Sequence, residues 1–329
     1  MLALTRDDVR KLVTMADAID LMKTAFTELS AGRTDSPLRT VIPVRENMAD
    51  ALFMPAHVPA MEALGVKIVA VFGENPSRGL PVINAMVVVL DIETGQPLAI
   101  MDGTYLTALR TGAVSGAATD LLARQESRVA VIIGAGAQGL TQAAAVCTVR
   151  PIERIIAVDR DQRQLDRFRE GMIRDWPDLV DRLETTIDAA AAVRQADIVC
   201  TATTSRTPVF DDRDLRPGTH VNGVGAYTPE MQELPAETIA RATVVVDAVG
   251  PALAEGGDLI KPLAAGLVTR EHFTRELGMV AAGLASGRQS DEEVTVFKSV
   301  GNAVQDVVVA RRAFDLARQS GAGTTIDLS

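Results

Sequence analysis

Residues 129–139 read Val-Ala-Val-Ile-Ile-Gly-Ala-Gly-Ala-Gln-Gly, a run of branched apolar residues that leads directly into a glycine-rich loop. A continuous apolar run of this length predicts a strand that is covered on both faces, as in a parallel sheet. The small residues that follow predict a helix from Gln138 to about Val149. A strand, a Gly-x-Gly-x-x-Gly loop and a helix in this order are typical of the first unit of a dinucleotide-binding fold.

Each part of this loop has a predicted role in binding a dinucleotide. Gly134 permits the tight turn, Gly136 lets the pyrophosphate approach the backbone, and Gly139 lets the helix pack closely on the sheet. The pyrophosphate is then expected on unpaired N–H groups at the positive end of the helix, where Ala137 and Gln138 lie.

An acidic residue ends the next predicted strand, Ile155–Val158. Asp159 follows Gly139 by about twenty residues, which is the spacing expected in a dinucleotide-binding unit. Its carboxylate would accept hydrogen bonds from the adenosine ribose hydroxyls, which favours NAD as the cofactor. Arg160 could reach a 2′-phosphate, so NADP stays open as an alternative.

Two further strand ends extend the predicted cofactor site. Thr201-Ala202-Thr203-Thr204 ends the strand Ile198–Thr201 with small hydroxylated residues that could border the ribose and the nicotinamide. Gly223-Val224-Gly225 ends the strand His220–Val224, where a close approach of the backbone would suit the nicotinamide ring. Strands and helices alternate through this region, which predicts a doubly wound parallel sheet.

The first hundred residues follow a different pattern, with helices over 5–31 and then short β-rich runs. These runs predict a mainly antiparallel sheet and span 39–44, 51–55, 66–72, 85–91 and 97–101. Helices are expected over 103–124 and from 302 to about 318, the last returning to the first domain. The predicted fold class is α/β, a Rossmann-type doubly wound parallel sheet (121–301) inserted in an α+β substrate and dimerisation domain (1–120 plus 302–329).

The composition argues against several classes of function. The 329 residues include 33 basic and 43 acidic ones with no cluster of cations, so we expect no nucleic acid partner. No stretch reaches the roughly 20 apolar residues of a membrane span. Acids near the N-terminus and the two cysteines, Cys147 and Cys200, are typical of a cytoplasmic protein. The scattered histidines, His57, His220 and His272, indicate no metal site.

Three cations of the first domain, Arg39, Lys67 and Arg110, stand among apolar or small residues. A charged side chain in such a setting needs an anionic partner. A substrate carboxylate fits this need, because arginine can bind it through two parallel hydrogen bonds. The alternative is that these are edge residues whose charged ends reach solvent.

Several segments match a known family in the right order along nearly the whole chain. They are Gly65-Val66-Lys67, Thr94-Gly95-Gln96-Pro97 to Asp102-Gly103, Thr107-Ala108-Leu109-Arg110-Thr111-Gly112-Ala113, Val131 to Gly139, Asn222-Gly223-Val224-Gly225-Ala226-Tyr227-Thr228-Pro229 to Glu233-Leu234, and Val296-Phe297-Lys298-Ser299-Val300-Gly301. On these segments the chain resembles the ornithine cyclodeaminase/mu-crystallin family.

The resemblance implies a homodimer that is built by the first domain and the C-terminal helix. It also implies that Arg39, Lys67 and Arg110 hold the substrate carboxylate, with Lys67 close to the reacting imine or carbonyl as the catalytic residue. It adds Thr111 and Ser299 to the expected cofactor-binding residues.

One segment departs from the cyclodeaminase pattern. True ornithine cyclodeaminases look like Gly-Gly-Asp-Cys-Pro where this chain has Gly225-Ala226-Tyr227-Thr228-Pro229, so Tyr227 replaces their catalytic aspartate. Tyrosine, with a reference pKa of about 10, is a poor base at neutral pH. Relatives that lack the aspartate resemble alanine dehydrogenases and cyclic-ketimine reductases.

We therefore expect an NAD(P)H-dependent oxidoreductase that acts on the Cα–N bond of a small amino or imino acid. Candidate reactions are reduction of pyrroline- or piperideine-2-carboxylate and reductive amination of pyruvate. One alternative is an ornithine cyclodeaminase, a lyase that uses NAD catalytically. Another is a non-catalytic, mu-crystallin-like protein that binds the nucleotide.

Overall fold

The computed structural model describes residues 1–44 and 49–327, and the chain divides into two compact units. The first unit comprises Met1–Arg110 and Asn302–Ser329, and the second comprises Thr111–Gly301. Helix α3 (Gly103–Leu122) runs from one unit into the other, and the boundary predicted at 120/121 falls within it. Residues 328–329 of the predicted first domain lie outside the described residues.

The first unit is built on a seven-stranded sheet with the order β15-β1-β6-β5-β4-β3-β2. β1 and β6 are parallel and the other neighbouring strands are antiparallel, which confirms the predicted mainly antiparallel sheet. The sequence did not indicate β1 and β15, because strands of three and two residues show no alternation. The strands are β1 (Leu2–Leu4), β2 (Thr40–Val44), β3 (Ala49–Val58), β4 (Ala63–Phe72), β5 (Ile83–Leu90), β6 (Pro97–Asp102) and β15 (Thr324–Thr325).

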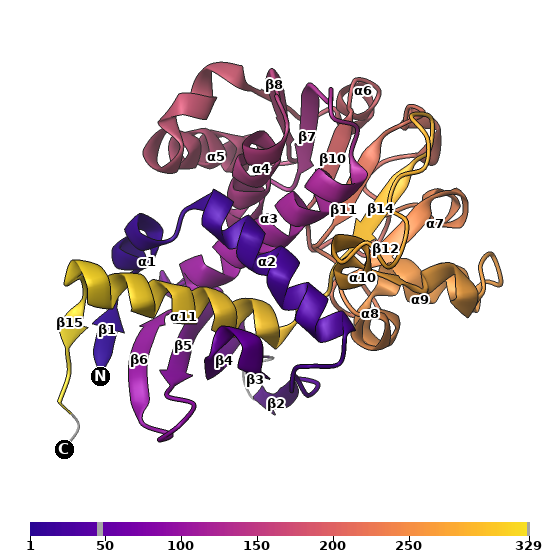
Figure 1. The fold of residues 1–329 in the computed structure, drawn as a ribbon. Helices are drawn as coiled ribbons and strands as arrows, with labels where there is room; N and C mark the ends of the chain where they lie inside the picture. The colour runs from indigo at the N-terminus through magenta and orange to yellow at the C-terminus, as the bar shows by residue number, and fades with distance from the viewer. Residues whose placement is uncertain (45–48, 328–329) are drawn as a thin grey trace. The chain divides into compact units, whose positions relative to one another are not determined.

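Three helices complete the first unit: α1 (Arg6–Leu12), α2 (Met15–Ser30) and α11 (Ala303–Ser320). Threonine side chains cap α1 and α2, because Thr5 and Thr14 accept hydrogen bonds from backbone N–H groups in the first turns. α11 begins after Asn302, whose side chain forms a capping box with Gln305. α11 packs against β3, β4, β5 and α2 (Figure 1), so the C-terminal helix returns to the first unit as predicted.

The second unit contains an eight-stranded sheet with the order β13-β12-β14-β11-β10-β7-β8-β9, and every neighbouring pair is parallel. This arrangement confirms the predicted Rossmann-type sheet. Three strands of this sheet, β9, β13 and β14, were not predicted from the sequence. β14 ends on a charged lysine, which interrupts its apolar pattern. The strands are β7 (Val129–Ile133), β8 (Arg154–Val158), β9 (Leu183–Thr186), β10 (Ile198–Thr201), β11 (His220–Gly223), β12 (Thr243–Val246), β13 (Arg275–Glu276) and β14 (Thr295–Lys298).

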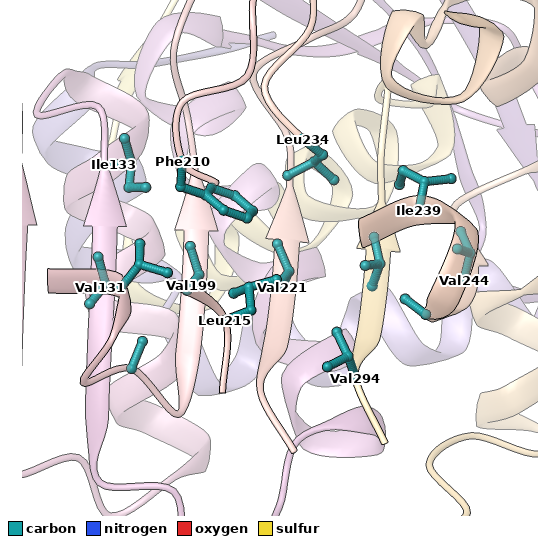
Figure 2. Packing of buried hydrophobic residues seen from close by; sticks show 14 of the residues in the cluster. Val131, Ile133, Val199, Phe210, Leu215, Val221, Leu234, Ile239, Val244 and Val294 are labelled. Carbon is teal, nitrogen blue, oxygen red and sulfur yellow. The ribbon is translucent and has the colours of Figure 1, made fainter. Parts of the chain in front are cut away.

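Apolar residues cover both faces of this sheet, which explains why its strands are continuously apolar. On one face, Val131, Val199 and Val221 of neighbouring strands pack beneath Phe210 and Leu234 (Figure 2). The other face is covered by a second cluster around Ile132, Cys200 and Phe168. The helices of the second unit are α4 (Ala137–Val149), α5 (Gln162–Asp175), α6 (Ala189–Val193), α7 (Ala236–Arg241), α8 (Val249–Glu255), α9 (Gly257–Ala264) and α10 (Leu277–Ala281).

Across residues 1–44 and 49–327, no helix combines the length and the apolar character that crossing a membrane requires.

Candidate active site

The glycine-rich loop is tight where it meets the sheet and open where a phosphate is expected. Gly134 has a φ of +105°, and a Cβ atom there would lie 2.5 Å from the carbonyl oxygen of Ala202. A Cβ atom on Gly139 would lie 2.3 Å from the carbonyl oxygen of Gly134, so the helix packs directly on the loop. Around Gly136 no described atom lies within 4 Å of the position of a Cβ atom. The open backbone at the start of α4 fits a pyrophosphate.

A cavity of about 490 Å³ lies beside the loop and is suited to part of a dinucleotide. The Asp159 carboxylate in its wall accepts hydrogen bonds from the backbone N–H groups of Ala135, at 3.0 Å, and Asp161, at 3.1 Å. These bonds fix the carboxylate beside the glycine loop. The predicted cofactor residues that line the cavity are Gly134, Gly136, Asp159, Arg160, Ala202 and Thr203.

The other predicted cofactor residues do not line this cavity. Thr201 is buried in β10, and its hydroxyl has no hydrogen-bond partner within the described part of the chain. The Thr111 carbonyl accepts a hydrogen bond from Gln142, and the Ser299 hydroxyl donates one to the buried Asp247 carboxylate. The rest belong to the first turn of α4 or to the loop after β11: Ala137, Gln138, Gly139, Val224 and Gly225.

In the first unit the structure brings two of the predicted cations together around a carboxylate that the sequence did not indicate. The Lys67 ammonium on β4 lies 2.7 Å from the Asp306 carboxylate on α11. Arg110 on α3 donates from Nε to the same carboxylate at 3.0 Å, and from Nη1 to the Gln305 side-chain oxygen. Lys67, Arg110 and Asp306 are all buried.

Burial and charge set the protonation of Lys67. Burial, followed by the positive charge of Arg110, lowers the pKa of Lys67 to about 7, although the Asp306 carboxylate opposes this shift. Arg39 also lowers this pKa. A strand was predicted from Arg39 to Val44, but β2 begins at Thr40, so Arg39 immediately precedes the strand. A lysine that titrates near neutral pH is able to donate and accept a proton.

An anion of the chain itself lies beside two of the cations that are expected to hold a substrate carboxylate. Asp306 is an internal anion that pairs with both Lys67 and Arg110, so their burial is partly compensated within the chain itself. Asp306 and Gln305 escaped notice because polar residues in the first turn of a helix are ordinary. Their burial in α11 is the signal that distinguishes them, and burial is not visible in a single sequence.

The remaining residues singled out from the sequence take varied positions. Tyr227 follows β11 and is 37% exposed. His220 is buried between Thr295 and Asn222, and burial lowers its pKa to about 3, so it is neutral at pH 7. Cys147 lies on α4 and Cys200 in β10, as predicted. Within the described ranges no group of three metal-ligating side chains was found.

A doubly wound parallel sheet with this glycine-rich loop defines a dinucleotide-binding protein of the Rossmann type. Residues 1–321 match the model of the ornithine cyclodeaminase/mu-crystallin family, and the chain belongs to this family.

Among its relatives, a Delta(1)-pyrroline-2-carboxylate reductase of Bacillus cereus is 42% identical over 330 residues, which cover 99% of this chain and 100% of that protein. The structure of Thermococcus litoralis Delta(1)-pyrroline-2-carboxylate reductase, in complex with NADH and L-proline, is 41% identical with a TM-score of 0.94. The match covers 99% of this chain and 100% of the Thermococcus litoralis chain. The structure of an archaeal alanine dehydrogenase dimer with bound NAD is 35% identical with a TM-score of 0.91. That match covers 100% of this chain and 99% of the other.

Proposed function

We propose that this chain is an NADH-dependent reductase of a cyclic imino acid of the pyrroline-2-carboxylate class. The observation that carries the proposal is the buried cluster of Lys67, Arg110 and Asp306, in which a lysine titrates near neutral pH beside an arginine suited to a carboxylate. Relatives named pyrroline-2-carboxylate reductase and alanine dehydrogenase support an oxidoreductase of the Cα–N bond.

The proposed reaction divides the work among these residues. Arg39 and Arg110 bind the substrate carboxylate and thereby orient Cα and the imine nitrogen. Lys67 donates a proton to the nitrogen, while Cα receives a hydride, so that the C=N double bond becomes a C–N single bond. Bound NADH supplies the hydride. Asp306 holds the Lys67 ammonium in place before the transfer.

The nucleotide is proposed to bind along the glycine loop of the second unit. The backbone at Gly136 would hold the pyrophosphate, and Asp159 would bind the adenosine ribose hydroxyls. The position of Asp159 in the wall of the cavity supports NAD over NADP. Arg160 lines the same cavity and is the residue through which NADP would be tolerated.

The homodimer is also a proposal, and an open apolar face of the first sheet supports it. The register aligns Phe53, Ile68 and Met86 across β3, β4 and β5. Met86 is 44% exposed, and the other two are half-buried, whereas the next row, which contains Lys67, is buried. An apolar row that is left open on a sheet is typical of a protein interface. The alanine dehydrogenase relative is described as a dimer.

Sedimentation tests this proposal. The wild type should sediment as a dimer, and Met86→Lys should shift it toward the monomer. Ile173→Lys, which changes an exposed isoleucine on α5 of the second unit, should leave the dimer intact. A monomeric wild type at micromolar concentration would contradict the assignment.

A substrate screen separates the candidate reactions. Oxidation of NADH and of NADPH would be followed with pyrroline-2-carboxylate, piperideine-2-carboxylate, and pyruvate plus ammonia. We expect the highest kcat/KM with pyrroline-2-carboxylate and NADH, with proline as the product. Formation of proline and ammonia from L-ornithine and NAD, without accumulation of NADH, would instead identify a cyclodeaminase. Tight NADH binding with no turnover on any substrate would identify a non-catalytic binding protein.

A further inference from the structure

A buried glutamate, Glu233, ties together two loops at the carboxyl ends of strands β10 and β11. One carboxylate oxygen accepts hydrogen bonds from the backbone N–H and the hydroxyl of Thr203, at 2.6 and 2.8 Å. The other accepts from the backbone N–H groups of Gly225, at 2.7 Å, and Ala226, at 3.0 Å. Glu233 is fully buried, and neither of its oxygens is left without a donor.

The loops held by Glu233 also contact each other and the glycine loop directly. A Cβ atom on Gly225 would lie 2.3 Å from the carbonyl oxygen of Thr203, and one on Gly134 would lie 2.5 Å from that of Ala202. The loops after β7, β10 and β11 are therefore packed backbone to backbone. A shift of the β10 loop would move the wall of the cavity, because Ala202 and Thr203 line it.

A second carboxylate fixes Glu233 itself. Asp258 on α9 accepts hydrogen bonds from the backbone N–H groups of Glu233, at 2.7 Å, and Leu234, at 2.9 Å. Its other oxygen lies 2.8 Å from the Lys298 ammonium, and both of these side chains are fully buried. Burial and then Asp258 raise the pKa of Glu233, while Lys298 lowers it, so the lysine favours the charged carboxylate that all four donors require.

The strand order shows which half of a dinucleotide these loops would meet. In a Rossmann-type sheet the two mononucleotide halves lie on opposite sides of the first strand. β8, which precedes Asp159, lies on one side of β7, and β10 and β11 lie on the other. The adenosine half is assigned to the β8 side. The β11 loop tied by Glu233 belongs to the nicotinamide half, and the β10 loop, whose Ala202 and Thr203 line the same cavity as Asp159, lies between the two halves.

We propose that Glu233 is a positioning residue that sets the shape of the nicotinamide half of the cofactor site. The proposal rests on the proposed function, because it needs a dinucleotide bound along this edge of the sheet. Glu233 would act through Thr203 and Gly225 and not by contact with the reacting atoms.

A matched carboxylate at the opposite end of the same strands provides the control. Asp197 precedes β10 and accepts hydrogen bonds from the backbone N–H groups of Arg128, at 2.8 Å, and Val129, at 3.0 Å, at the start of β7. It also pairs with Arg124 at 2.7 Å. Like Glu233, it joins two segments, but it lies at the amino ends of the strands and away from the cavity.

The test compares Glu233→Gln with Asp197→Asn in the full chain. The amide NH2 group that Glu233→Gln introduces would face backbone N–H donors, so one of the two loops loses its acceptor. Dissociation constants would be measured for NADH, by its fluorescence, and for ADP-ribose, which lacks the nicotinamide. We expect Glu233→Gln to weaken NADH binding about tenfold and ADP-ribose binding less than about threefold. Asp197→Asn should lower the melting temperature without changing the ratio of the two constants.

The proposal would be overturned if Glu233→Gln weakened the binding of NADH and ADP-ribose equally, or weakened the binding of neither. If Glu233→Gln does not fold, Thr203→Val decides, because it removes one hydroxyl donor to Glu233 with little change in shape. A loss selective for NADH supports the proposal, and an unchanged ratio of constants overturns it. A wild type that binds neither ligand would instead refute the proposed function, so the two failures are distinguishable.

Discussion

The Lys67 ammonium lies 2.7 Å from the Asp306 carboxylate, and the two residues are only 2% and 0% exposed. They come from β4 and from α11, which are far apart in the sequence. Arg110 joins them through the second oxygen of the carboxylate. The C-terminal helix therefore contributes a charge to the centre of the first unit as well as packing on its sheet. In the proposed function, chemistry and stability would depend on the same three side chains.

Asp306→Asn should slow the proposed reaction and lower the stability of the fold. The amide keeps the size of the side chain but removes the negative charge that raises the pKa of Lys67. The limb of the pH profile of kcat/KM that reports on Lys67 should therefore move to lower pH, and imine reduction at a pH of about 7.5 should fall. Loss of one partner of a buried ion pair should also lower the free energy of unfolding by about 3 kcal/mol, measured by urea denaturation.

Asp315→Asn is the control on the same helix. Asp315 pairs with Arg311 one turn away, and its side chain is 35% exposed. A partly exposed pair at this helical spacing contributes about 0.5 kcal/mol. Neither the pH profile nor kcat/KM should change. Equal effects of the two substitutions would show that Asp306 stabilises the helix without influencing the reaction.

Lys67→Ala should abolish most turnover while NADH binding is retained. The substitution removes the proposed proton donor from the first unit and leaves the glycine loop of the second unit unchanged. A loss of general acid catalysis corresponds to a decrease in kcat of about a hundredfold or more. Lys11→Ala, at an exposed position on α1, should behave as the wild type. Undiminished turnover of Lys67→Ala would remove Lys67 from the mechanism.

Much of the fold could be predicted because local sequence patterns indicate many of its strands and helices. The apolar run before Gly134 predicted a strand with the observed ends, Val129–Ile133. The helix after Gly301 was predicted to return to the first unit, and it does. β14 was not predicted, because the charged Lys298 interrupts its apolar pattern and only pairing with its parallel neighbours, β11 and β12, identifies it as a strand.

The candidate site was predictable only in part, because its contacts join distant parts of the chain. Lys67 and Arg110 could be identified because each is a charged residue among apolar or small neighbours in the sequence. Their partner Asp306 looks like an ordinary acid at the start of a helix. Glu233 likewise stands in a short loop, and its four hydrogen bonds exist only once β10 and β11 are paired.

Asp159→Ala should reduce the preference for NADH over NADPH. The carboxylate lines the cavity beside the glycine loop, where it would bind the ribose hydroxyls and repel a 2′-phosphate. Its loss should raise the dissociation constant of NADH about tenfold and that of NADPH much less. Fluorescence titration with both nucleotides measures the ratio.

Asp161→Asn is the control for Asp159→Ala, because it removes a nearby negative charge that does not line the cavity. Asp161 caps α5 through the backbone N–H of Arg163, and asparagine caps a helix equally well. Because Asp161 does not line the cavity, the ratio of the two constants should stay at the wild-type value. A change of cofactor preference in this variant, or none in Asp159→Ala, would show that the adenosine ribose is bound elsewhere.

The low pKa of Lys67 also predicts how the stability of the protein depends on pH. In the folded chain this pKa is about 7, against 10.5 for an ordinary lysine, so between these values the unfolded chain binds more protons. Stability therefore rises with pH in this window, by at most about 1.4 kcal/mol per pH unit, and the gain is lost as the pH falls through about 7. Burial raises the pKa of Cys147 and Cys200 from 9.0 to about 12, which opposes the rise above pH 9.

Urea denaturation between about pH 7 and pH 8.5 isolates this contribution. Lys67→Met has a similar volume and no titrating group, so the difference in unfolding free energy between wild type and variant cancels the other residues. We expect this difference to change in favour of the wild type as the pH rises, because deprotonation of Lys67 relieves the desolvation of its charge. A difference that stays constant across the window would mean that Lys67 remains fully protonated in the folded chain. Lys67 would then be a weaker proton donor than proposed, and Asp306 would hold it in a permanent ion pair.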